Sequence, residues 1–185
     1  MIPTIAEAVS HYYNQINSYV GAARDVKKAD KHMDGFTKIF KSAVFDAVVH
    51  EKHDAIVEGA FLRKRWDMAY GDSEKFTHAM ELKSIVLSKM GKCFSNRVEE
   101  AIGVAVDLRH KNPDIKMNYF LVIEDDLLGF SPKRTERLER IHDFCRYIHK
   151  DLALYNNVGC VIIDSTGHYD FIYSNLSDYV DFWAN

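Results

Sequence analysis

Hydrophobic residues recur at helical spacing in the first third of the chain, which predicts two helices there. The first covers residues 5–23, "IAEAVSHYYNQINSYVGAA", and ends before the polar stretch "RDVKKADKHMDG". The second covers residues 36–58, where apolar positions return every three or four residues. These positions are Phe36, Ile39, Phe40, Ala43, Val44, Ala47 and Val48.

After residue 64, two strand-like segments around a turn predict a β-hairpin. "RWDMAY" and "FTHAMELKSI" flank "GDSEK", in which Gly-Asp-Ser is typical of a turn. Alternation places Phe76, His78, Met80 and Leu82 on one face, and Thr77, Ala79, Glu81 and Lys83 on the other. With the turn centred on residue 73, Asp67 lies opposite Ala79. Glu81 is then its diagonal neighbour, roughly 7–8 Å away between backbones.

The second half of the chain alternates helices with apolar runs. "SNRVEEAIGVAVDLRH" predicts a helix capped by Ser95 or Asn96 and ended by Asn112-Pro113. "MNYFLVIED" and "VGCVIID" predict buried strands, and "YDFIY" predicts a last strand before a short terminal helix. Between the two buried strands, residues 132–155 predict a long helix. Its apolar stripe is Leu138, Ile141, Cys145, Ile148 and Leu152.

These elements together predict an α/β fold with a central mixed β-sheet flanked by helices. We find no repeat, linker or low-complexity tract, so we expect one domain over residues 1–185. The hydrophobic content of 47% indicates a globular protein. The apolar runs are too short to span a bilayer, and "MIPTIAEAVSHYYNQ" does not resemble a signal peptide. Three scattered cysteines without a CxxC pair favour a reducing, cytoplasmic location.

Charge is unevenly distributed along the sequence, although the net charge is only -3. Residues 61–98 carry eight basic and four acidic residues, and residues 151–185 carry five acidic residues and no basic one. Such segregation is compatible with a basic face for nucleic acid and equally with ordinary solvated surfaces.

Asp67, Glu81 and Lys83 stand out because a buried hairpin face normally excludes charge. Two carboxylates at this spacing are suited to hold a divalent cation, and oxygen ligands favour Mg²⁺ over zinc. A neighbouring lysine is suited to stabilise a phosphate undergoing hydrolysis. The pattern Asp…Glu-x-Lys is similar to the PD-(D/E)XK nuclease signature. Its spacing alone leaves two interpretations open, a catalytic site and a solvated strand face.

A longer set of motifs resembles the XhoI family of type II restriction endonucleases. "MDGF", "RWD", "ELKS" and "NRVEEAIGVAVD" occur in that order between residues 33 and 107, and the similarity covers about residues 28–130. One departure is Trp66, where the nuclease signature has a proline before the aspartate.

The resemblance implies a PD-(D/E)XK fold and Mg²⁺-dependent, site-specific cleavage of double-stranded DNA. It assigns catalysis to Asp67, Glu81 and Lys83, with Asp67 and Glu81 as metal ligands. It also implies a homodimer, a CTCGAG-like palindrome as the recognition site, and a cognate DNA methyltransferase as genetic partner. Two alternatives are a structure-selective repair or junction nuclease of the same superfamily and a DNA-binding module that does not cleave.

Further site candidates surround this motif. Glu51 and Glu58 are candidates for an additional metal carboxylate. Candidate DNA contacts are Arg63, Lys64, Arg65, Lys89, Lys92, Asn96 and Arg97. Two of these have structural alternatives, since Asn96 is also a candidate N-cap and Arg97 is placed to pair with Glu100.

Overall fold

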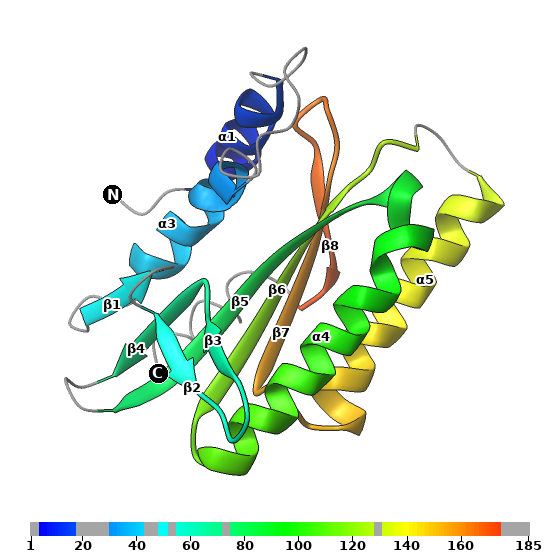
Figure 1. The fold of residues 1–185 in the computed structure, drawn as a ribbon. Coiled ribbons are helices and arrows are strands. Elements are labelled where there is room, and N and C mark those ends of the chain that lie inside the picture. The colour runs from blue at the N-terminus through cyan, green and yellow to red at the C-terminus, as the bar shows by residue number, and fades with distance from the viewer. Residues whose placement is uncertain are drawn as a thin grey trace.

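A six-stranded mixed sheet forms the centre of the protein in a computed structural model (Figure 1). The structure describes residues 4–17, 30–42, 48–51, 55–71, 75–127 and 131–174. The sheet order is β1-β4-β5-β6-β7-β8, and β5, β6 and β7 run parallel to one another. The six strands are β1 Val48–Glu51, β4 Met68–Gly71, β5 Phe76–Val86, β6 Lys116–Glu124, β7 Asn157–Ile163 and β8 Tyr169–Tyr173. A separate antiparallel pair consists of β2 Ile56–Glu58 and β3 Arg63–Arg65.

Helices lie on both faces of this sheet, which confirms the predicted fold class (Figure 1). One face carries α1 Ile5–Asn17, the 3-10 helix η1 Asp30–Met33 and α3 Asp34–Ser42. The other carries η2 Leu87–Lys89, α4 Met90–Lys111, α5 Pro132–Arg146 and the π-helical turn η3 Tyr147–Asp151. None of the helices in the described ranges is long and apolar enough to cross a membrane.

Aromatic side chains fill the core on each side of the sheet. Under α3, the ring of Phe120 lies 5.8 Å from Phe36 and 5.0 Å from Phe40. Under α4 and α5, Tyr119 packs 6.0 Å from Phe144 and 5.3 Å from Tyr155. Alternate residues of β6 therefore face opposite cores, which explains why this strand is an unbroken apolar run. Burial of each such side chain contributes about 1.5–3 kcal/mol.

The β4–β5 hairpin has the predicted faces but a different register. Met80 and Leu82 belong to the core under α3, and Ala79 belongs to the core under α4. Met68 pairs with Met80 and Ala69 with Ala79, so the pairing is two residues away from the predicted one. A β-bulge between Tyr70 and Gly71 shifts the pairing of the two strands near the turn. The prediction, which centres the turn on residue 73, does not include this bulge.

The predicted helix over residues 36–58 is confirmed for Phe36 to Ser42 and is wrong at residues 48–51 and 56–58. Residues 48–51 and 56–58 are strands, rich in the β-branched residues that favour extended backbone. The predicted N-cap at Ser95 or Asn96 is also wrong, because α4 begins at Met90 and Lys89 is its N-cap.

The long helix predicted to reach residue 155 ends earlier, in η3, and Leu152 is 39% exposed. The strands at 117–125, 158–164 and 169–173 are confirmed as β6, β7 and β8. Residues 18–23 of the first predicted helix and the predicted terminal helix lie outside the described residues.

Candidate active site

Asp67, Glu81 and Lys83 come together on the sheet face that α4 covers. Asp67 immediately precedes β4, and its Oδ2 accepts a hydrogen bond of 2.7 Å from the backbone N–H of Leu82. Extending the observed register by one residue places Asp67 opposite Glu81, which corrects the predicted position opposite Ala79. The Nζ of Lys83 forms an ion pair with Oε1 of Glu81. The hairpin thus brings the three charges into one cluster.

Lys64 also joins this cluster, although it comes from β3. Its Nζ lies 3.0 Å from Oε1 of Glu81 and 3.1 Å from Oε1 of Glu100. It also lies 5.6 Å from the centre of the Trp66 ring, where a cation is favourably placed. The sequence predicts Lys64 as a DNA contact beside Arg63 and Arg65, but its side chain is directed toward the carboxylates.

Glu100, on α4, is the member of the cluster that sequence reasoning missed as a site residue. Besides Lys64, it contacts Arg97 through Nη1 at 2.8 Å and Lys83 through Nζ at 3.5 Å. The contact with Arg97 confirms the pairing that the sequence raises as an alternative to DNA contact. Burial opposes ionisation of Glu100, but Lys83 and Lys64 outweigh it and lower its pKa to about 2. The sequence signal that identifies Glu100 is its position within the family motif, four residues after Asn96.

Burial makes the electrostatics of the cluster strong. The Glu81 side chain is only 5% exposed, and its Oε2 is buried without a hydrogen-bond partner. Burial and the nearby Glu81 carboxylate raise the pKa of Asp67 to about 6. For Lys83, burial favours the neutral amine, but Glu81 and Asp67 outweigh it and raise its pKa. Although Lys64 and Lys83 pair with Oε1 of Glu81, its Oε2 has no hydrogen-bond partner and Asp67 is easily protonated, so room remains for a cation at these two carboxylates.

These two carboxylates fit a divalent cation. A hard cation is bound by oxygen atoms, and the partnerless Oε2 of Glu81 supplies one next to the Asp67 carboxylate. Within the described ranges, no three His, Cys, Asp or Glu side chains are grouped closely enough to form a complete metal-binding set. The pair is nevertheless chemically suited to a divalent ion.

Of the two additional metal candidates, Glu58 does not join the pair, and the side chain of Glu51 is not described. Glu58 lies on β2, is 61% exposed and forms an ion pair of 3.1 Å with Lys111 at the far end of α4. Glu51 ends β1, where its backbone pairs with Met68, and its side chain lies outside the described part of the chain.

The predicted DNA contacts are distributed around the cluster. Arg63 and Arg65 are exposed on β3, on either side of the inward-directed Lys64. Lys89 and Asn96 are exposed near the start of α4. Lys92 lies in the first turn of α4, but its side chain is outside the described residues.

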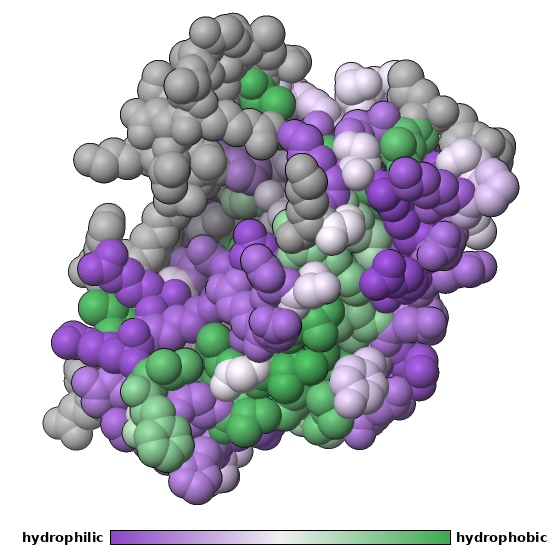
Figure 2. Space-filling view, turned by 45° about the vertical axis from the view of Figure 1, so that its right-hand side comes forward, coloured by the Kyte–Doolittle hydropathy of each residue, from purple (hydrophilic) through white to green (hydrophobic). Residues whose placement is uncertain are grey.

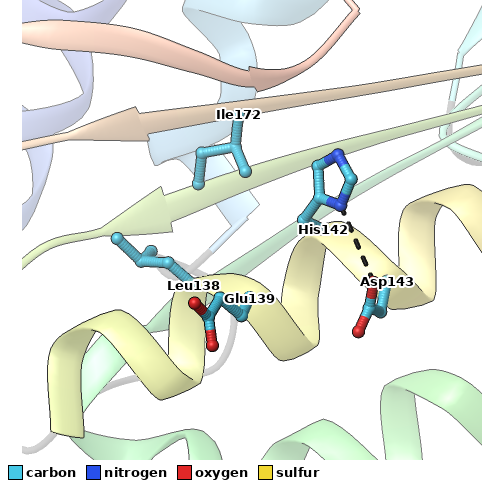
Figure 3. Close-up of a pocket in the computed structure, with 5 residues that line it drawn as sticks. All are labelled: Leu138, Glu139, His142, Asp143 and Ile172. Atoms are coloured by element: carbon cyan, nitrogen blue, oxygen red, sulfur yellow. Dashed lines mark ion pairs between the residues drawn. The ribbon is translucent and has the colours of Figure 1, made fainter. Parts of the chain in front are cut away.

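A hollow of about 460 Å³ lies elsewhere, between α5 and β8 (Figure 3). Its lining residues are Leu138, Glu139, His142, Asp143 and Ile172. Nδ1 of His142 lies 3.8 Å from Oδ1 of Asp143, as the dashed line marks. None of the candidate site residues lines this hollow, so it is separate from the charged cluster.

A mixed sheet flanked by helices, with a hairpin that brings Asp67, Glu81 and Lys83 together, is consistent with a nuclease-like fold. The family model "Restriction endonuclease XhoI" matches residues 15–147, and the chain belongs to this family. The match includes β2 to β6 and therefore every charged residue of the cluster.

Two curated relatives match shorter stretches. One is the type II restriction enzyme AbrI of Azospirillum brasilense, 34% identical over 85 residues, which are 42% of this chain and 38% of the relative. The other is the type II restriction enzyme XhoI of Xanthomonas vasicola, 32% identical over 96 residues, 48% of this chain and 39% of the relative. The chain thus spans about two fifths of the length of these relatives. No solved structure matches significantly.

Proposed function

We propose that the protein is a type II restriction endonuclease that hydrolyses phosphodiester bonds of double-stranded DNA at a specific sequence. The observation that carries this proposal is the convergence of Asp67, Glu81 and Lys83 on one buried face, with the Asp67 carboxylate bound to the Leu82 N–H. Membership of the XhoI family supports it. A solvated strand face does not account for a glutamate that is 5% exposed.

Asp67 and Glu81 hold the divalent cation, and we propose Mg²⁺. When bound, the ion supplies positive charge for the scissile phosphate and a more acidic water. The ligand atoms are carboxylate oxygens, without thiolate or clustered imidazole, and such sets favour Mg²⁺ over zinc. A bound cation gives the partnerless Oε2 of Glu81 a positive partner. The same cation favours the ionised form of Asp67 and so lowers its raised pKa.

Lys83 acts on the reacting phosphate. Its ammonium is held beside Glu81, and its raised pKa keeps it charged at neutral pH. In this position it orients the attacking water and stabilises the charge that develops on the phosphate oxygens. Lys64 brings a second ammonium to the same carboxylate and contributes to the positive potential that attracts DNA.

DNA approaches across the exposed basic residues Arg63, Arg65 and Lys89, with Lys92 and Asn96 nearby on α4. Cations on this surface neutralise phosphates and fix the position of the duplex. Arg97 is already engaged by Glu100, so contact with a base requires that it leave this partner.

The remaining features follow from the proposed activity. A homodimer matches a two-fold symmetric site such as CTCGAG and places one active site on each strand. The chain acts as one domain in the cytoplasm, where its substrate is found. A cognate DNA methyltransferase protects the host sequence from cleavage.

Digestion of a sequenced plasmid tests the proposal. With Mg²⁺, the wild-type protein should produce discrete fragments whose mapped ends share one sequence, and EDTA should abolish cleavage. Glu136→Gln, which changes an exposed carboxylate on α5, serves as a control and should cleave as the wild type does. Cleavage confined to branched or damaged DNA would establish the structure-selective alternative, and binding without cleavage would establish the non-cleaving one.

A further inference from the structure

Two ammonium groups of the charged cluster are shared between two carboxylates. The Nζ of Lys64 lies 3.0 Å from Oε1 of Glu81 and 3.1 Å from Oε1 of Glu100. The Nζ of Lys83 also pairs with Oε1 of Glu81, and it lies 3.5 Å from Oε1 of Glu100. Each lysine therefore has a second carboxylate within ion-pair distance, and a small movement of its ammonium exchanges one partner for the other.

Glu100 is held in this position by groups that do not belong to the shared pairs. Its second oxygen, Oε2, accepts a hydrogen bond of 2.8 Å from Nη1 of Arg97, one turn earlier on α4. The hydroxyl of the buried Tyr155 donates a hydrogen bond of 2.9 Å to the backbone carbonyl of Ala101, the next residue of α4. A side chain anchored on a fixed helix, with its other oxygen engaged, keeps Oε1 directed at the two lysines.

A cation at Glu81 competes with the lysines. In the proposed function, on which this inference rests, Asp67 and Glu81 bind the divalent cation. Positive charges a few Å apart repel one another, so the cation disfavours the ammonium groups beside Glu81. The cluster that the structure describes has three carboxylates for three cationic side chains. Of these carboxylates, Glu100 is the one that the cation leaves to the lysines.

We propose that Glu100 is a positioning residue, which takes over Lys64 and Lys83 when Glu81 binds the cation. Both ammonium groups then stay in the site, and Glu81 is released to the cation. The Glu100 side chain is 34% exposed and that of Glu81 only 5%. Figure 2 shows this face of the molecule, where hydrophilic side chains border a hydrophobic area over the lower part of α4. Ammonium groups held by Glu100 therefore lie nearer to water and to an approaching phosphate than those held by Glu81.

Glu100→Gln tests this role, because the amide keeps the size of the side chain and loses the charge that holds the lysines. At saturating Mg²⁺, we expect the single-turnover cleavage rate of a mapped duplex to fall about 10- to 100-fold, as for other residues that orient the groups around a metal. DNA affinity in a gel-shift assay should not fall, because the variant loses a charge that repels phosphate. Glu99→Gln, which changes the neighbouring exposed carboxylate of α4, is the matched control and should match the wild type in both assays.

Calorimetric titration of the DNA-free protein with Mg²⁺ gives a readout that does not depend on cleavage. In Glu100→Gln, the cation displaces the two lysines from Glu81 without the second carboxylate that the structure places beside them. We therefore expect the Mg²⁺ dissociation constant to rise about 10-fold, and that of Glu99→Gln to stay at the wild-type value.

Removal of the lysines separates positioning from metal ligation. In a Lys64→Met/Lys83→Met background, adding Glu100→Gln should change the Mg²⁺ dissociation constant by less than about 2-fold, because no ammonium is left to be taken over. Lys64→Met alone should reduce the effect of Glu100→Gln, and it is the background to use if loss of both lysines unfolds the protein by circular dichroism.

The alternative roles of Glu100 give different results. A metal ligand would lose the same Mg²⁺ affinity with and without the lysines, and this result would overturn the proposal. A purely structural residue would lower stability but leave the cleavage rate and the dissociation constant unchanged, which would overturn it as well. A wild type that binds Mg²⁺ but does not cleave DNA would contradict the proposed function instead, and the calorimetric comparison would still decide the role of Glu100.

Discussion

The raised pKa of Asp67 predicts that this carboxylate destabilises the metal-free protein at neutral pH. Its pKa is about 6, against an ordinary value of 3.8, because the group is buried and close to Glu81. Between these two values the native state holds a proton that the unfolded chain releases. The free energy of unfolding therefore falls as the pH rises from about 4 to about 6. A shift of about two units corresponds to about 3 kcal/mol.

Asp67→Asn removes this titration while keeping an oxygen that accepts the Leu82 N–H bond. In EDTA, we expect the variant and the wild type to be similarly stable near pH 4. The variant should become more stable by about 3 kcal/mol at pH 8. Urea unfolding followed by circular dichroism across this range measures the difference. Added Mg²⁺ should stabilise the wild type at pH 8 and the variant much less, because a ligand stabilises the state that binds it.

Glu136→Gln serves as the control, since it removes an exposed carboxylate of α5 outside the cluster. Its stability should follow that of the wild type at every pH. The reasoning would be refuted by a difference between wild type and Asp67→Asn that stays constant from pH 4 to pH 8. Such a result would mean that Asp67 has the same proton affinity in the native and unfolded chain.

Three further outcomes follow from the same contacts. Lys83→Ala should lower the single-turnover cleavage rate about 10²- to 10³-fold while DNA still binds in a gel-shift assay; a near-normal rate would exclude Lys83 from the chemistry. Glu100→Gln should lower the free energy of unfolding by only about 1 kcal/mol, because the ion pairs of Glu100 are partly exposed. Urea unfolding should show this loss above pH 4.5, and the difference from the wild type should disappear toward pH 2, where Glu100 becomes protonated. Gly59→Ala should cost about 1–3 kcal/mol because the new methyl displaces the Asp107 carboxylate from the backbone N–H of Phe61, between β2 and β3, and an unchanged thermal midpoint would contradict that contact.

Local pattern was sufficient to predict the hairpin and the parallel strands. Alternation after residue 64 has the period of a strand, and the apolar runs of β6 and β7 have the character of strands buried on both faces. The same approach failed at residues 48–51 and 56–58. Val48 and Val49 continue the spacing of the preceding helix, and a short apolar segment fits a strand or a helix by periodicity alone.

From the sequence, only the members of the charged cluster that lie on the β4–β5 hairpin were predictable. Asp67, Glu81 and Lys83 are neighbours through strand pairing, which a sequence pattern encodes. Lys64 and Glu100 reach Glu81 from β3 and α4, through tertiary contacts that no local pattern contains. Their roles therefore emerge only from the folded chain.

The most direct test of the account is the single-turnover cleavage rate of a mapped duplex as Mg²⁺ is varied. It is measured for the wild type, Asp67→Ala, Glu81→Ala and Glu136→Gln. The account predicts saturable, Mg²⁺-dependent cleavage by the wild type and Glu136→Gln. It predicts no cleavage by the other two variants, which still bind the duplex because each loses a carboxylate that repels phosphate. Undiminished cleavage by Asp67→Ala and Glu81→Ala would contradict the assignment of the active site to this hairpin.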